Sequence, residues 1–245
     1  MEFYCKQFAL NHGKSSMKVG TDAILLAGFT AEYFAKSVEE KHDIKTVLDV
    51  GTGCGILALC MAQAFTKADV TAIDIDPMSV EQAEDNFASS PFADRLHTVC
   101  TSFQNFSLQT TSNYDLIISN PPFFTSSLHS PDIRRNAARH NVQLPLEDFV
   151  LAVDKVKNAK TAIAVILPAE EMNKIKILFK EKNIFPVQSL QIFPANDKPL
   201  KRIITIFKYS SDGEILQENT DKLMIRTDTG EYTEDYMRLT SAFLL

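Results

Sequence analysis

A strand, a glycine-rich turn and a helix follow one another directly in the first third of the chain. Thr46–Val50 is short and rich in residues typical of strands, and Ile56–Phe65 is an apolar run of helical character. Between them lie Gly51, Gly53 and Gly55. Glycine can adopt positive φ and lets the backbone come close to a ligand. This order predicts a ligand-binding turn at the carboxyl end of a strand in an α/β sheet.

A second strand that ends in an acid indicates a nucleoside-containing ligand. Asp69–Asp74 has the composition of a strand, and the carboxylate of Asp74 can accept hydrogen bonds from both hydroxyls of a ribose. We therefore expect a cofactor that contains adenosine. Its identity is open at this point. Gly53–Ala58 also fits the dinucleotide pattern G-x-G-x-x-G/A, with Asp74 about twenty residues on, as in nicotinamide-dependent dehydrogenases.

The segment Asn120–Phe123 (Asn-Pro-Pro-Phe) indicates the chemistry. It follows Tyr114–Ser119, an apolar run that predicts a buried strand, so it lies where ligands bind in open α/β sheets. The side-chain carbonyl of Asn120 and the backbone carbonyl of Pro121 can both accept hydrogen bonds from one planar amino group. The two prolines stiffen the turn. Phe123 offers an apolar face on which an aromatic ring such as adenine can stack.

Two features favour S-adenosylmethionine over a nicotinamide cofactor. The string Asp49–Gly55 (Asp-Val-Gly-Thr-Gly-Cys-Gly) resembles motif I of class I S-adenosylmethionine-dependent methyltransferases, in which an acid closes the first strand. The Asn-Pro-Pro-Phe segment has a direct role in methylation of an amine and none in hydride transfer. The resemblance implies an enzyme that methylates an amine on a flat group.

Composition limits the remaining classes of protein. The chain has 245 residues, of which 45% are hydrophobic, enough for the core of one large domain. The four cysteines have no metal-binding spacing, so we expect neither a metal site nor a disulfide framework. No apolar run approaches ~18 residues, and the N-terminus has no signal-peptide core, which predicts a cytoplasmic protein without a membrane partner.

Basic residues that could bind nucleic acid occur in three clusters. The net charge of −6 does not favour nucleic acid overall, but a phosphate backbone needs only a local basic surface. Each cluster is also compatible with an ordinary solvated face. The one that follows the Asn-Pro-Pro-Phe turn is the strongest candidate. The clusters are Lys6, Lys14 and Lys18; Arg134, Arg135, Arg139 and His140; and Lys198, Lys201 and Arg202.

The apolar periodicity predicts alternating helices and strands along most of the chain. Thr21 or Asp22 should cap the first helix. Helices are expected at 21–34, 77–88, 146–156 and 169–181, and further strands at 95–100, 161–167, 185–193 and 202–209. The last two of these strands have no helix between them, so they should pair antiparallel. A short strand and a helix are expected in the tail, 223–245.

These elements predict an α/β fold in one methyltransferase domain that spans 1–245. Its core, 46–210, should be doubly wound, with a mostly parallel seven-stranded Rossmann-like sheet and an antiparallel last strand. An N-terminal segment, 1–45, should lie at the substrate and cofactor edge, and 211–245 should form a C-terminal extension. The oligomeric state does not follow from the sequence, and no obligatory protein partner is evident.

A series of short motifs spans the chain nearly end to end. In order, they are Phe3-x-x-Lys6-x-Phe8, Met17–Asp22, Asp49–Gly55, Asn120–Phe123, Arg139-His140 followed by Leu144–Asp148, Lys198-Pro199-x-x-Arg202, and Glu231–Tyr236. With this series the chain resembles the bacterial tRNA1(Val) (adenine(37)-N6)-methyltransferases. Many methyltransferases share the cofactor and catalytic motifs, so the terminal motifs carry the likeness to this particular family.

The resemblance implies how the cofactor is held. The three turn glycines, Gly51, Gly53 and Gly55, lie under the methionine part of S-adenosylmethionine. Asp49 orients its amino group and Asp74 holds its ribose. Ser102 matches a position that faces the adenine, although a serine is a weaker acceptor there than an acid.

The resemblance also implies how the substrate, a tRNA, is held. Asn120 and Pro121 hold the N6 amine of the target adenine next to the cofactor, Pro122 completes the turn, and Phe123 stacks on the base. Apart from the resemblance, the charge and chain position of the basic clusters lead us to expect RNA contacts for six residues: Lys18, Arg134, Arg135, Arg139, Lys201 and Arg202. Lys18 and Asp22 belong to a motif expected near the cofactor edge, but a solvated lysine and a helix-capping acid are equally compatible with the sequence.

Three alternatives share the same core motifs. Guanine-N2 methyltransferases of ribosomal RNA also carry Asn-Pro-Pro-Phe, often followed by a histidine, where this chain has Phe124. Glutamine-N5 methyltransferases of release factors usually have Asn-Pro-Pro-Tyr and a helical N-terminal domain, for which the chain before Asp49 is too short. The third alternative is a non-catalytic RNA-binding subunit with this fold. Such a subunit would not need to keep Asp49–Gly55, Asp74 and Asn120–Phe123 all intact.

Overall fold

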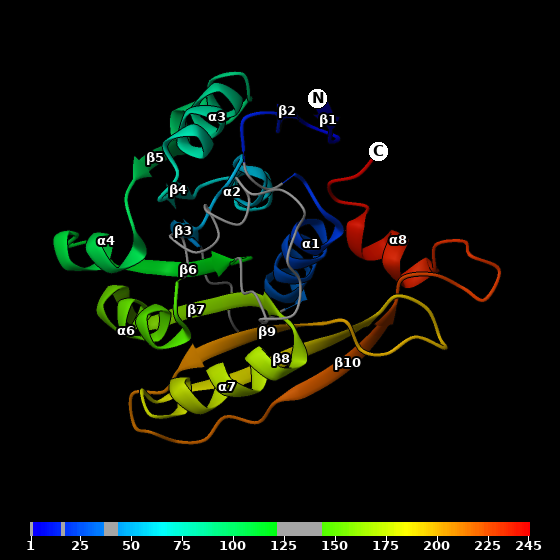
Figure 1. Cartoon of the computed structure of the whole chain (residues 1–245). Helices are drawn as coiled ribbons and strands as arrows, with labels where there is room; N and C mark the ends of the chain where they lie inside the picture. The colour runs from blue at the N-terminus through cyan, green and yellow to red at the C-terminus, as the bar shows by residue number, and fades with distance from the viewer. Residues whose placement is uncertain (1, 16–17, 37–43, 122–143) are drawn as a thin grey trace, which may run out of the picture.

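The computed structural model describes residues 2–15, 18–36, 44–121 and 144–245. Helices and strands alternate through most of these ranges (Figure 1). The strands are β1 (Glu2–Tyr4), β2 (Ala9–Asn11), β3 (Thr46–Val50), β4 (Asp69–Asp74), β5 (Leu96–Cys100), β6 (Tyr114–Ser119), β7 (Lys157–Leu167), β8 (Ile184–Phe193), β9 (Arg202–Tyr209) and β10 (Asn219–Met224). The helices are α1 (Thr21–Lys36), α2 (Ile56–Ala64), α3 (Pro77–Ala88), α4 (Phe103–Gln109), α6 (Leu146–Val156), α7 (Ala169–Lys180) and α8 (Glu234–Thr240), with a short 3₁₀ turn at Ala93–Arg95.

Most strands belong to one sheet with the order β10-β8-β9-β7-β6-β3-β4-β5. All pairs are parallel except those of β9, which runs antiparallel to both β7 and β8. The predicted doubly wound α/β fold and the antiparallel pairing of 185–193 with 202–209 are therefore confirmed. The described sheet has eight strands where seven were predicted, because β10 adds a strand beside β8 after the antiparallel strand.

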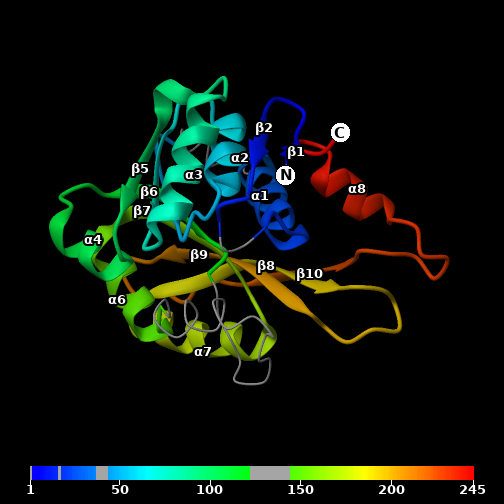
Figure 2. The same ribbon diagram turned by 45° about the horizontal axis from the view of Figure 1, so that its top comes forward.

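Two helical layers cover the sheet, and its central strands β3, β6, β7 and β9 are largely buried on both sides. One core lies under α1, α2, α3 and α8, and the other under α4, α6 and α7 (Figures 1 and 2). Strand β7 shows the reason, since Ala162 and Ala164 face the first core while Ile163 and Val165 face the second. A strand buried on both faces has a continuous apolar sequence, which is how the sequence predicted it.

The predicted helices lie close to their expected bounds, with one difference at the start of α1. The helix already includes Thr21 and Asp22, so neither residue precedes it as a cap. Helix α3 begins where expected, because Pro77 occupies the first turn and the Asp76 carboxylate accepts a hydrogen bond from the Met78 amide at 3.2 Å. Along the described ranges, no helix is long and apolar enough to cross a membrane.

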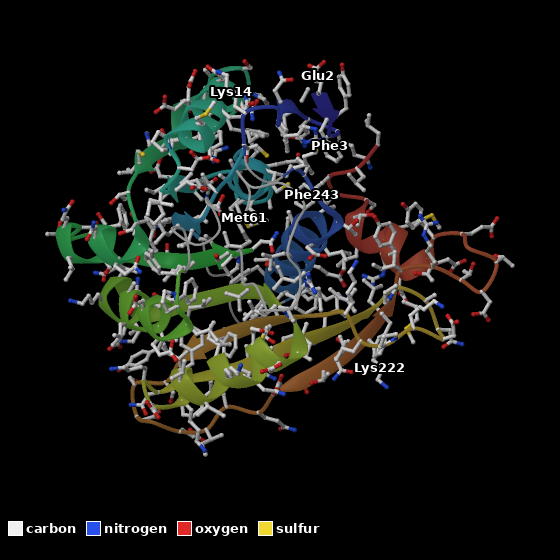
Figure 3. The ribbon with its side chains drawn as sticks, viewed as in Figure 1. Glu2, Phe3, Lys14, Met61, Lys222 and Phe243 are labelled. Carbon is white, nitrogen blue, oxygen red and sulfur yellow. The ribbon has the colours of Figure 1, made fainter. Side chains whose placement is uncertain are left out.

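The two ends of the described chain meet. The amide of Lys6 donates to the carbonyl of Phe243 at 2.9 Å, and Phe243 is fully buried in the core under α1 and α2. Phe3, on strand β1, packs against this core (Figure 3). The β1–β2 hairpin is thus held by residues from the far end of the sequence.

Candidate functional site

The glycine turn after β3 lies at the carboxyl edge of the sheet, and its three glycines adopt positive φ angles of 73°, 56° and 86°. Gly55 is packed tightly, since a Cβ there would lie 2.5 Å from the ring of Phe87. Gly51 differs: a Cβ there would meet no described atom within 4 Å. Gly55 is therefore required by packing, whereas the space beside Gly51 leaves the backbone open to a ligand.

Asp49, the fourth residue of β3, is completely buried. One of its carboxylate oxygens, Oδ2, accepts hydrogen bonds from the Thr52 hydroxyl at 2.6 Å and from the Ala58 amide at 3.1 Å. The other, Oδ1, has no hydrogen-bond partner in the described part of the chain. Burial raises the pKa of Asp49 to about 7. A buried carboxylate with one free oxygen fits a cationic group of a ligand.

Asp74, at the end of the neighbouring strand β4, is only partly buried. Its two oxygens accept hydrogen bonds from the amides of Gly53 at 2.8 Å and Asp76 at 2.9 Å. Burial raises the pKa of this carboxyl above its ordinary value. Each oxygen keeps a second lone pair, so the carboxylate can still accept hydrogen bonds from hydroxyl groups.

Ile75 is a candidate site residue that the sequence analysis does not identify. It follows Asp74 directly, and its side chain remains 43% exposed although it is large and apolar. The sequence contains one indication of this role, because the isoleucine directly follows the acid that ends β4. An exposed apolar side chain at this edge can pack against the flat face of a ligand.

The N-terminal segment lies against the glycine turn. The Asn86 side chain on α3 donates to the carbonyls of Asn11 and Cys54, both at 2.7 Å, and so ties this segment to the turn. The Ser15 hydroxyl lies 3.3 Å from the position that a Cβ on Gly53 would occupy. Lys14 extends over α3 and forms ion pairs with two of its acids (Figure 3). These contacts place the described part of the N-terminal segment beside the glycine turn, and its role at the cofactor edge stays a prediction. Lys18 is exposed.

Ser102 lies on the other side of Asp74, in the turn after β5. The Thr101 amide donates to the Asp74 carbonyl at 2.9 Å, which places this turn beside β4. The Ser102 hydroxyl accepts a hydrogen bond from the Asn105 amide at 3.2 Å and caps α4. The cap provides a structural reason for the serine, and its contact with a ligand stays a prediction.

Asn120 and Pro121 follow β6, and strand β3 lies between β6 and β4 in the sheet. Ser119 is opposite Val50 in the sheet register, and its hydroxyl donates to the Val50 carbonyl at 2.7 Å. This bond joins the strand that carries Asn120 to the strand that carries Asp49. Asn120 is partly buried and Pro121 is buried. The fold therefore brings the Asn-Pro segment and the glycine turn together at adjacent strand ends, where ligands bind in doubly wound sheets.

The structure also places the Lys198–Arg202 cluster at this edge. Because β9 is antiparallel, its first residues lie beside the last residues of β7, with Ile203 opposite Leu167. Arg202 Nε donates to the Asp22 carboxylate at 3.0 Å, and Lys201 is exposed. Two motifs from opposite ends of the sequence thus meet in one ion pair, and part of the Arg202 guanidinium is already engaged.

Several predicted site residues lie outside the described ranges: Pro122, Phe123, Arg134, Arg135 and Arg139. Across the described residues, no group of three or more His, Cys, Asp or Glu side chains could hold a metal ion. All four cysteines have free thiols, and three of them are buried.

Comparisons with known proteins assign this arrangement to a family. Residues 28–144 match the family model of the methyltransferase small domain. The tRNA1(Val) (adenine(37)-N6)-methyltransferase of Porphyromonas gingivalis is 34% identical over 98% of this chain and 94% of that protein. The enzyme of the same name from Flavobacterium johnsoniae is 33% identical over 99% of both chains. A solved structure of a predicted O-methyltransferase from Agrobacterium tumefaciens has the same fold, with a TM-score of 0.63, 18% identity and coverage of 90% of this chain and 96% of that one. The chain belongs to the tRNA1(Val) (adenine(37)-N6)-methyltransferase family.

Proposed function

We propose that this protein transfers the methyl group of S-adenosylmethionine to the exocyclic N6 amine of an adenine in tRNA, at position 37 of tRNA1(Val). The observation that carries the proposal is the juxtaposition at one sheet edge of the open glycine turn and Asp49 on β3 with Asn120 and Pro121 after β6. One strand end has the groups for a cofactor, and the adjacent strand end has the acceptors for an amine. The relatives that match nearly the whole chain are named for this activity.

The residues present fit S-adenosylmethionine. Its amino group is a cation, which suits the buried and unpartnered Oδ1 of Asp49. Its ribose has two hydroxyls, which suit the remaining lone pairs of Asp74. The space beside Gly51 admits the methionine part, and Ile75 offers an apolar surface to the adenine. When bound, the cofactor supplies a methyl group that its sulfonium has already activated.

Asn120 and Pro121 act on the substrate amine. Their two carbonyl oxygens accept the two N6 hydrogens, which fixes the amine and raises the reactivity of its lone pair. The N–C bond forms as the bond between the methyl group and sulfur breaks. The nitrogen becomes more positive in this step, and the same two carbonyl dipoles stabilise that charge until one of the two N6 protons is released to solvent. The adenine must leave its stack in the folded RNA to reach this edge, and Phe123 stacks on the displaced base.

The reaction needs no strong general base from the protein. Alignment of the amine with an activated methyl group is the main requirement, and holding two reactants together can lower a barrier by roughly 7–11 kcal/mol. The stiff Asn-Pro-Pro turn and the hydrogen bond from Ser119 to β3 provide this alignment. We expect six basic residues to hold the RNA backbone: Lys18, Arg134, Arg135, Arg139, Lys201 and Arg202.

Replacement of Asn120 by alanine tests the proposal. Asn120→Ala removes one acceptor of the amine, so the methylation rate at saturating tRNA should fall by on the order of 10³-fold, while affinity for S-adenosylhomocysteine stays close to that of the parent. The matched control is Asn113→Ala, an exposed asparagine just before β6 at the opposite edge of the sheet, which should keep full activity.

Identification of the product completes this test. The purified parent protein is incubated with tRNA from a strain that lacks the gene, and the modified nucleoside is identified by mass spectrometry. N6-methyladenosine is expected. N2-methylguanosine, or methyl groups found in protein and not in RNA, would replace the proposed function with one of its alternatives.

A further inference from the structure

A short hairpin after β10 presents an arginine at the carboxyl edge of the sheet. Arg226 and Tyr232 form an antiparallel bridge, closed by a hydrogen bond from the Thr227 amide to the Glu231 carbonyl at 2.8 Å. Gly230 permits the tight turn, because it adopts a φ of +89°. This geometry places the two side chains of the bridge next to each other.

Three side chains form a stack that leads from the core to the surface. Tyr236 on α8 is buried, and its ring stacks on that of Tyr232 with centroids 4.5 Å apart and planes 15° from parallel. The guanidinium carbon of Arg226 lies 4.4 Å from the Tyr232 centroid. Two planar groups cannot both lie that close to one face of a ring, so Tyr232 lies between the other two. The outermost layer is the exposed guanidinium of Arg226.

The stack leaves part of this guanidinium available. Arg226 Nη1 donates to the Gly230 carbonyl at 2.6 Å, which fixes the rotation of the group. In the described part of the chain, no carboxylate lies within ion-pair distance of Arg226, and Nε and Nη2 have no hydrogen-bond partner. These two nitrogens form the planar fork that binds two oxygens of a phosphate.

The other described arginines are engaged differently. Arg95 donates to three backbone carbonyls and is partly buried. Arg202 pairs with Asp22, and Arg238 pairs with Glu32 and Asp235. Arg226 is therefore unusual among the described arginines, because it is exposed, held rigidly by a tyrosine, and without an acidic partner.

The hairpin lies on the same sheet edge as the candidate site. Strand β10 is parallel to β8, and the amides of Ile225 and Arg226 continue the ladder to the carbonyls of Phe193 and Pro194 at 2.9 and 3.1 Å. The segment after Phe193 leads to Lys201 and Arg202 at the start of β9. The hairpin projects beyond the body of the protein beside this segment (Figures 1 and 2). A large ligand bound at the Asn120 edge can extend along this edge towards Arg226.

We propose that Arg226 binds a backbone phosphate of the substrate RNA, away from the target base, with Tyr232 and Tyr236 holding the guanidinium in place. This inference rests on the proposed function and identifies one element that holds the tRNA. The rigid fork loses little side-chain freedom on binding, and its fixed outward position suits a phosphate backbone more than a small molecule.

Direct binding measurements test this role. Retention of an unmodified tRNA1(Val) transcript is measured over a range of salt concentrations, with S-adenosylhomocysteine present. Arg226→Ala should weaken binding by about tenfold at low salt and make the slope of log affinity against log salt shallower by roughly one unit. Arg226→Lys should recover most of the slope but only part of the affinity, because lysine keeps the charge and lacks the fork. Tyr232→Leu should fall between the parent and Arg226→Ala, and Tyr232→Phe should match the parent.

Arg238→Ala is the matched control. It removes the same charge from the same C-terminal region, but its guanidinium is paired with carboxylates, so the salt slope should not change. If Arg226→Ala lowers the thermal stability of the protein and leaves the salt slope at the parental value, the stack is a structural brace and the inference is wrong. The proposed function is judged separately. If the salt slope depends on Arg226 but the parent forms no N6-methyladenosine, the proposed activity alone is overturned. If the parent forms N6-methyladenosine and Arg226→Ala does so with the parental KM for tRNA, the phosphate contact alone is overturned.

Discussion

Strands β3 and β4 are neighbours, and each has an aspartate at its carboxyl end, but the two carboxylates have different surroundings. Asp74 is partly exposed, and both of its oxygens accept backbone hydrogen bonds. Asp49 is fully buried, with both of its hydrogen bonds on one oxygen and none on the other. On β4 the aspartate is partly solvated and both of its oxygens are hydrogen-bonded. On β3 the aspartate is buried and one of its oxygens has no hydrogen-bond partner among the described residues.

From this difference we expect the two carboxylates to bind different groups of the proposed cofactor. A partly solvated carboxylate with its orientation fixed by amides is suited to neutral hydroxyls. A buried carboxylate with a free oxygen is costly by itself, and a cationic partner removes that cost. The cofactor's amino group should therefore depend on Asp49 more strongly than its ribose depends on Asp74.

The largest expected effect comes from Asp49→Ala. The ammonium group of the cofactor would then be buried without a counter-charge, so affinity for S-adenosylhomocysteine should fall by about 3–5 kcal/mol in calorimetry. The control is Asp115→Ala. Asp115 accepts hydrogen bonds from the amides of Lys45 and Thr46 at the opposite end of β3, so this change should leave cofactor affinity unchanged. A loss for Asp49→Ala no larger than that for the control would show that the free oxygen does not meet the amino group.

A smaller effect is expected for Asp74→Ala. Loss of hydrogen bonds between a charged acceptor and the ribose should weaken binding by about 1–3 kcal/mol. Asp69→Ala, at the other end of the same strand, should have no effect on the same titration. S-adenosylhomocysteine and its 2′-deoxy analogue should bind Asp74→Ala with equal affinity, while the parent prefers the ribose form. A preference retained by the variant would assign the ribose to another group.

The pH dependence of cofactor affinity should reflect the ionisation of Asp49. Asp49 has a pKa of about 7 and must be ionised to bind an ammonium group. Affinity should therefore be constant above pH 7 and fall by about tenfold for each pH unit below it. Calorimetry from pH 6 to pH 8, in buffers of different ionisation enthalpy, should show proton release on binding at pH 6. Binding that is independent of pH over this interval would contradict the role of Asp49.

The same pKa has a consequence for the stability of the protein without its cofactor. The folded state holds the Asp49 proton up to about pH 7, whereas the unfolded chain releases it near the ordinary pKa of 3.8. The folded state is thus favoured at low pH, and this contribution is lost as pH rises from about 4 to about 7. Thermal unfolding at several pH values should show this decrease, and S-adenosylhomocysteine should reduce it.

The smallest effect is expected from Thr52→Val. The Thr52 hydroxyl donates to Asp49 Oδ2, and this bond lowers the pKa of the carboxyl against the larger effect of burial. Its loss should weaken cofactor affinity by about 0.5–1.5 kcal/mol and move the midpoint of the pH dependence upwards. Thr52→Ser keeps the hydroxyl and should behave like the parent. A valine variant with an unchanged midpoint would show that Thr52 does not tune Asp49.

Local patterns in the sequence predicted the central elements well. The glycine turn between β3 and α2 and the start of α3 at Pro77 each depend on residues a few positions apart. Strand β10 was less predictable, because Asn219–Met224 is polar and mostly exposed, and only Leu223 is buried. Such an edge strand lacks the alternation or the apolar run that identifies a strand.

Long-range relations were not predictable from the sequence. Nothing near Asp22 indicates an ion pair with Arg202, since the two residues are 180 positions apart. Only a family resemblance distinguishes the motif Glu231–Tyr236 in the sequence, and the stack of Arg226 on Tyr232 depends on how the hairpin folds. Likewise, the sequence showed an acid at Asp49 but not that one of its oxygens lacks a partner, because that depends on the packing of α2 over the strand end.

The meeting of the two chain ends has a consequence for the order of events during synthesis. The partner of Lys6 is Phe243, and helix α8 approaches α1 so closely that a Cβ on Gly28 would lie 2.2 Å from the Leu239 carbonyl. Until α8 has been synthesised and packs on α1, the β1–β2 hairpin and the face of α1 at Gly28 lack this support. Strands β3, β4 and β5 can already pair at that stage, but the helical layer over them stays incomplete. A variant truncated before Leu239 should therefore expose this face of α1 and be cleaved by proteases faster than the parent.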